Sequence, residues 1–77
     1  MLSFELKKPK SGEASDELEV FLDKAGLKSF LAQLHFLEEG QTEHVHLMSE
    51  SWGGNHLDEQ PQGSESTPIR HVKIFLR

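Results

Sequence analysis

One stretch decides the fold of this chain: residues 23–40, with the sequence DKAGLKSFLAQLHFLEEG. Its large apolar residues recur at spacings of three and four, which places one apolar stripe along a helix: Leu27, Phe30, Leu31, Leu34 and Leu37. Asp23 can cap the helix, because its carboxylate can accept from the N–H groups of the first turn. Gly40 suits the left-handed position after the helix end. The stretch therefore predicts an amphipathic helix with both ends marked.

Four other segments alternate apolar and polar residues, as half-buried strands do. Two precede the helix, at residues 2–7 and 18–23, and two follow it, at residues 44–48 and 71–77. The polar turn between the first two allows a hairpin. The expected fold is a single α+β domain over residues 1–77, a two-layer ββαββ arrangement with one helix packed on a four-stranded, mainly antiparallel sheet.

A long loop at about residues 49–70 separates the last two strands. Structureless loops of that length are uncommon in compact domains, so this one is expected to be functional, to be mobile or to hide a short hairpin turned at Gly53-Gly54-Asn55. It contains the only tryptophan, Trp52. Trp52 either covers an edge of the small core or is presented as an anchor for a partner.

Alternation assigns each strand residue to one of two sheet faces. The face toward the helix should carry Leu2, Phe4, Leu6, Leu18, Val20, Leu22, Val45, Leu47, Val72, Ile74 and Leu76. The opposite face has no second helix to cover it and should carry Ser3, Glu5, Glu19, Phe21, His44, His46, Met48, His71, Lys73 and Phe75. Apolar residues among polar ones are typical of an interaction surface. The alternative is that Phe21 and Phe75 only stabilise the sheet as cross-strand neighbours.

Composition excludes several classes of partner. The net charge is −5, which argues against nucleic acid, since phosphate neutralisation requires a Lys/Arg surface. The acidic balance fits a basic protein partner, or simply solubility. No apolar run approaches the roughly 20 residues that span a bilayer, and the start lacks signal-peptide features. Together with the absence of cysteine, this predicts a cytoplasmic protein that does not bind membranes.

The histidines raise the possibility of a metal site. His44 and His46 lie on one face of a strand, and His71 on a neighbouring strand could complete a zinc site. No cysteine or carboxylate stands at a spacing that requires a metal, so we expect none and keep zinc binding as an alternative.

The sequence gives little support to an enzymatic function. Ser49 and Ser51 lie near histidines in the sequence, but no strand–turn–helix elbow surrounds them. Asp58-Glu59 sits in a polar loop, where both carboxylates are expected to be solvated. The sequence therefore predicts a non-enzymatic protein without a cofactor.

The segment from His44 to Asn55, followed by Leu57, Gln62-Gly63 and His71 to Leu76, resembles the immunity protein 32 family of bacterial polymorphic toxin systems. The resemblance covers roughly residues 17–77, and its most specific part is His-x-His-Leu-Met followed by Ser-Trp-Gly-Gly. It implies a non-enzymatic inhibitor that binds and neutralises a cognate toxin in the producing cell. The matched signature positions are His46, Met48, Trp52, Gly53, Gly54 and His71, and no residue roles come with them.

The leading hypothesis is therefore a toxin-neutralising immunity protein, with these partner-binding residues: Phe21, His44, His46, Met48, Trp52, Gly53, Gly54, His71 and Phe75. The alternative is a homodimeric structural or regulatory module that pairs through Phe21, Met48 and Phe75.

Overall fold

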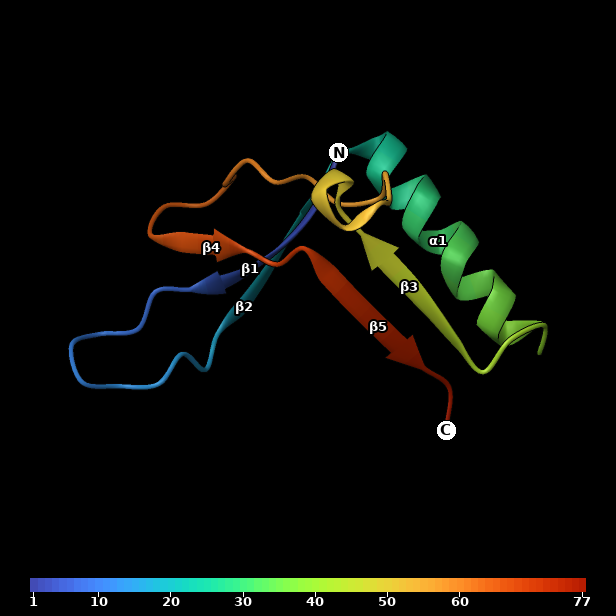
Figure 1. Ribbon diagram of the computed structural model, residues 1–77, viewed down its shortest axis with the longest axis horizontal. Coiled ribbons are helices and arrows are strands. Elements are labelled where there is room, and N and C mark those ends of the chain that lie inside the picture. Colours follow the sequence, from blue (N-terminus) through green and yellow to red (C-terminus); the bar gives the residue numbers. More distant parts are fainter.

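The computed structural model describes all residues from Met1 to Arg77 and has an α+β fold (Figure 1). The elements follow the order β1 (Leu2–Lys7), β2 (Leu18–Leu22), α1 (Lys24–Glu38), β3 (His44–Met48), the 3₁₀ helix η1 (Glu50–Trp52), β4 (Ser66–Pro68) and β5 (His71–Phe75). The predicted helix and the four predicted strands all form. None of the helices has the length and hydrophobicity needed to cross a membrane.

The strands form two antiparallel sheets instead of the single four-stranded sheet expected. The first sheet has the order β2-β1-β4 and the second pairs β3 with β5. The extra strand, β4, comes from the long loop, and only Ile69 and Arg70 separate it from β5. Ile69 N donates to Phe4 O and Ser49 N donates to Arg70 O, at 2.7 and 2.9 Å. This two-residue junction passes from one sheet to the other, and the sheets diverge on either side of it (Figure 1).

Both ends of α1 follow the sequence signals. Asp23 accepts a hydrogen bond of 2.8 Å from Gly26 N. At the other end Gly40 adopts a φ of 74°. Gly40 N donates to Leu37 O and Gln41 N donates to Phe36 O, which is the paired pattern of a Schellman motif.

The core is small and lies between α1, the start of β1 and the second sheet. Its central cluster is Leu2, Phe4, Leu47 and Leu57, with Phe30, Ile69, Val72 and Ile74 packed against it. The Phe4 and Phe30 rings meet edge to face, with their centroids 5.6 Å apart. Phe4 therefore links the first sheet to the helix.

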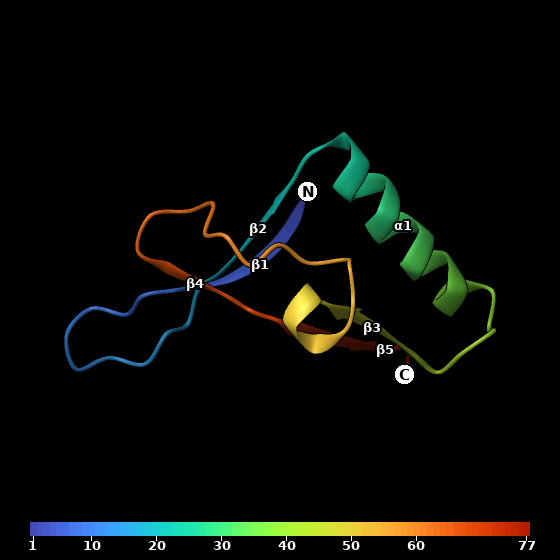
Figure 2. The ribbon, with the colours of Figure 1, turned by 45° about the horizontal axis from the view of Figure 1, so that its top comes forward.

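The expectation that the helix covers the whole apolar face of the sheet is wrong for the first sheet. Four residues expected there are between 38 and 51% exposed: Leu6, Leu18, Val20 and Leu22. α1 starts beside the end of β2 and then runs away from the first sheet, alongside β3 (Figures 1 and 2). The helix covers Leu2 and Phe4 but does not reach the far half of the hairpin.

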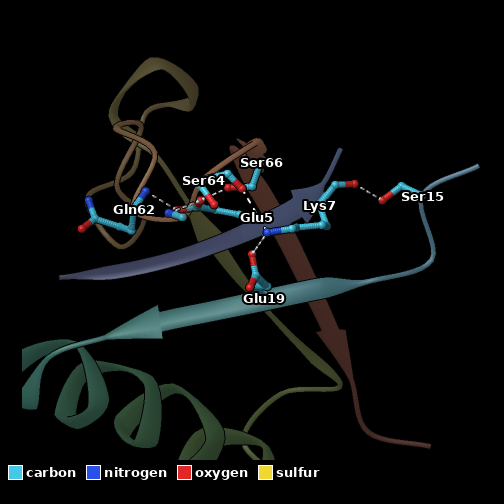
Figure 3. A network of polar contacts seen from close by, with 8 residues as sticks. Glu5, Lys7, Ser15, Glu19, Gln62, Ser64 and Ser66 are labelled. Carbon is cyan, nitrogen blue, oxygen red and sulfur yellow. Dashed lines mark hydrogen bonds and ion pairs between the residues drawn. The ribbon is translucent and has the colours of Figure 1, made fainter. Parts of the chain in front are cut away.

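The opposite face of the first sheet was expected to be uncovered, and this is also wrong. Ser3 and Glu5 are fully buried, because the chain from Gln62 to Ser66 folds over them (Figure 3). The Glu5 carboxylate accepts from Ser3 Oγ, Ser66 Oγ, Gln62 N and Gly63 N, at distances between 2.5 and 3.1 Å. A buried carboxylate thus fastens the long loop to β1.

Candidate functional site

Five aromatic rings form a continuous row on the outer face of the second sheet, the face turned away from α1. We name it the ring cluster, and its members in order are Phe75, His44, His46, His71 and Trp52. Neighbouring ring centroids lie 4.8–5.1 Å apart. The antiparallel register pairs His44 with Phe75 and Met48 with His71, so alternate residues of both strands share this face.

Trp52 reaches the cluster from the 3₁₀ helix η1. Trp52 N donates to Ser49 O, and Gly53 N donates to Glu50 O. Gly53 then ends the turn with a φ of 87°, a conformation that glycine adopts without steric cost. The Trp52 ring lies against His71 and remains 56% exposed. The ring therefore stays at the surface, and this turn takes the place of the hairpin that Gly53-Gly54-Asn55 could form.

The turn that carries Trp52 is fixed from two sides. On one side Gly54 lies so close to β3 that an added Cβ would stand 2.5 Å from Met48 O. On the other, Glu59 accepts from Ser51 N at 2.8 Å. Hydrogen bonds from the hydroxyls of Ser51 and Ser49, together with the Ser51 N–H, lower the pKa of Glu59 to about 2. From the sequence, Glu59 is expected to be a solvated loop carboxylate, and no local pattern of residues indicates that it anchors the turn.

The three histidines of the cluster form a chain and do not converge on one point. His44 Nε2 lies 3.0 Å from His46 Nε2, and His46 Nδ1 lies 2.9 Å from His71 Nε2. Both ring nitrogens of His46 therefore face a neighbouring imidazole. No group of three His, Cys, Asp or Glu side chains has a geometry that could hold a metal ion.

His46 is the central member of this chain and its pKa is lowered. Desolvation by burial is the largest cause, followed by the positive charges that His44, His71 and Lys73 carry when protonated. A neutral His46 can donate from one nitrogen and accept at the other, which is what a ring between two imidazoles requires.

We expect His46 to titrate below the ordinary histidine value of 6.5. Because the unfolded chain then binds the proton more readily, the contribution of His46 to stability is complete above pH 6.5 and is lost as pH falls below it. NMR titration of the histidine ring protons, assigned with His46→Asn, measures the midpoint. In chemical denaturation, His46→Asn should lose less stability between pH 7 and 5 than the parent. A midpoint at or above 6.5 would contradict a neutral His46 between its two neighbouring imidazoles.

The nine predicted partner-binding residues do not share one surface. His44, His46, Trp52, His71 and Phe75 make up the ring cluster, and Gly53 and Gly54 shape its turn. Met48 is half-buried beneath that turn. Phe21 belongs to the first sheet, where its ring packs against Gly63 of the covering loop. Phe21, Met48 and Phe75 therefore provide no common surface for the alternative homodimer that would pair through them.

The surface around Trp52 and the histidines is not hollowed. The three surface hollows of the molecule lie at the polar turn of residues 7–17, beside the start of α1, and between α1 and β5. Small-molecule sites are concave and bury most of their ligand. A shallow row of rings with an exposed tryptophan is instead typical of contact with another protein.

No model of a known protein family, no curated protein and no solved structure matches this chain.

Proposed function

We propose that this protein is a non-enzymatic, cytoplasmic immunity protein that neutralises a cognate bacterial toxin by binding it through the ring cluster. The observation that carries the proposal is the exposed Trp52 at the end of a row of four further rings, with no hollow around Trp52 and the histidines. Tryptophan is among the residues that contribute most at protein interfaces. Contact with the His71 ring and a turn fixed from two sides restrict the Trp52 ring before a partner arrives, which lowers the entropy cost of binding.

The resemblance to the immunity protein 32 family supports the same location for the proposed toxin-binding site. Of its signature positions, His46, Trp52 and His71 belong to the ring cluster. Gly53 ends the turn below Trp52, and Gly54 packs that turn against Met48. Six positions separated by up to 25 residues in the sequence thus meet in one small region of the surface.

The rim of the cluster carries charges of both signs. Lys73 Nζ and Arg77 Cζ each lie 5.1 Å from the centre of the Phe75 ring. At the other end Glu50 is exposed next to Trp52. Such a rim can fix the orientation of a partner around an aromatic centre, while the net charge of −5 favours encounter with a basic toxin.

Co-expression with the toxin gene next to this one tests the proposal, and purified toxin allows the affinity to be measured by calorimetry. We expect Trp52→Ala to weaken binding by about 2 kcal/mol or more, roughly 30-fold, and Phe75→Ala by less. Phe36→Ala is the matched control, since Phe36 on α1 is 44% exposed, as Phe75 is. It should leave both binding and protection unchanged.

Two outcomes would reject the proposal. The first is a toxin that remains lethal and forms no complex in size-exclusion chromatography. The second is a complex that Trp52→Ala and Phe75→Ala weaken no more than Phe36→Ala does, since the toxin would then bind elsewhere.

A further inference from the structure

The flank of α1 beside β5 carries a self-complementary stripe. Its residues follow one another at helical spacings of three and four along one side of the helix: Lys24, Leu27, Leu31, Leu34 and Glu38. Leu27 and Leu31 are nearly half exposed, although they belong to the apolar stripe predicted for the core. Leu31 is the middle residue of the helix, with Lys24 at its start and Glu38 at its end.

The charges of this stripe oppose the preference of the helix itself. The N-terminus of a helix favours acidic side chains and the C-terminus favours basic ones. The first turn of α1 has no acidic residue and begins with Lys24, while the helix ends with Glu38. The helix dipole thus disfavours both charges. Within the chain Glu38 Oε1 lies 3.2 Å from His35 Nδ1, and no ion pair involves Lys24, so an intermolecular pair would give Lys24 a partner.

The molecule also exposes more surface than a monomer of its size. Its accessible surface is 5592 Å², whereas a monomeric protein of 8.7 kDa is expected to expose about 4,700 Å². The polar turn of residues 8–17 contributes to this surplus, as do ten large apolar side chains more than a third exposed. The difference of roughly 900 Å² is comparable with the ~800 Å² that each partner buries in a stable interface.

A groove lies beside the stripe and can receive a side chain from outside. It has a volume of about 540 Å³ and lies between α1 and β5, where Leu31, Leu34, Ile74 and Leu76 line it. The groove adjoins the C-terminal half of α1. Leu27 lies in the N-terminal half of the helix, which spans about 22 Å in all.

We propose that a second copy of this chain covers the stripe, with the two α1 helices antiparallel across a two-fold axis near Leu31. Such an arrangement is isologous, so each contact occurs twice. Leu31 meets Leu31 of the partner subunit, Lys24 lies beside Glu38 of the partner subunit, and each Leu27 faces the partner's groove. A single stripe with leucines in its middle and opposite charges at its ends matches another copy of itself.

This interface meets the ring cluster only at Phe75, which also lines the groove. α1 packs on one side of the second sheet, through Val45 and Leu47, and the other four rings lie on the opposite side. The dimer is proposed from α1 and its groove, so its test does not require the toxin.

Light scattering after size-exclusion chromatography, at a series of micromolar concentrations, tests the dimer directly. The parent should show twice the 8.7 kDa mass of the chain, and Leu31→Glu should be monomeric, with the circular dichroism spectrum of a folded protein because Leu31 is a surface residue. A parent that is monomeric at every concentration, or a dimer that Leu31→Glu leaves intact, would overturn the proposal.

Charge reversal tests the antiparallel arrangement. Lys24→Glu and Glu38→Lys should each weaken the dimer about tenfold, because each replaces two attractive pairs with two repulsive ones. The double variant restores both pairs and should restore the dimer. Lys24→Glu favours the helix macrodipole and breaks no ion pair of the chain, so weaker association of this variant cannot come from a weaker helix. Failure of the double variant to recover would exclude this pairing of helices.

Discussion

Replacing Glu5 with alanine is expected to lower the free energy of unfolding by about 3–5 kcal/mol. The change removes a buried carboxylate and leaves four donors without an acceptor, namely the hydroxyls of Ser3 and Ser66 and the N–H groups of Gln62 and Gly63. A domain of this length has roughly 4–12 kcal/mol of stability in total. Chemical denaturation followed by circular dichroism should show a midpoint at much lower denaturant, and a protein unfolded in buffer if the parent lies at the low end of that range.

The same carboxylate predicts a loss of stability in acid. Desolvation by burial raises the pKa of Glu5, but hydrogen bonds from Ser3, Ser66, Gln62 and Gly63 outweigh it and lower the pKa from 4.5 to about 2. The ionised form is therefore favoured in the folded state, and its contribution is complete above pH 4.5. It is lost as pH falls from 4.5 to 2, and the full difference corresponds to about 3 kcal/mol.

Two variants separate this carboxylate from the other acidic groups. Glu5→Gln keeps the shape of the side chain but has one acceptor oxygen, so it should be less stable than the parent at pH 7 and lose less stability between pH 4.5 and 2. Glu13→Gln, in the exposed polar turn, should behave as the parent does. If the parent and Glu5→Gln lose the same free energy of unfolding between pH 4.5 and 2, then Glu5 is not the anchor of the loop.

The sequence predicts each element well where the signal is local. The spacing of the leucines gives α1, and Asp23 and Gly40 give its ends, because caps and stripes depend only on neighbours within a few residues. Alternation likewise places His44 and His46 on one face of β3. The register with β5, which brings His71 and Phe75 to the same face, follows from pairing at a distance and is not visible in the strand itself.

The errors arise where burial depends on what covers a face. Alternation says that Phe4 and Leu6 share one face and that Ser3 and Glu5 share the other, which is correct. It does not say that α1 turns away before it reaches Leu6, or that the loop before β4 folds over Glu5. Trp52 lies in that long loop, where no periodicity exists, so its contact with His71 could not be predicted from the pattern of residues.

Replacing Gly54 with alanine is expected to destabilise the protein by about 2–3 kcal/mol and to weaken the proposed binding of a toxin as strongly as Trp52→Ala. The added Cβ would lie 2.5 Å from Met48 O and 2.7 Å from Met48 Cβ. Either the end of β3 or the turn after it must move. Because Trp52 is two residues before Gly54, the movement should displace its ring from His71, and a shift in the fluorescence of the only tryptophan reports this directly.

The control is the neighbouring Gly53→Ala. Gly53 has a φ of 87° and no atom within 4 Å of an added Cβ, so alanine there should cost about 1–2 kcal/mol from backbone strain alone and meet no clash. A second comparison places Gly54→Ala in the Trp52→Ala background. If Gly54 acts on binding only by positioning Trp52, the double variant should bind no more weakly than Trp52→Ala. A further loss of affinity in the double variant would mean that Gly54 or Met48 touches the partner itself.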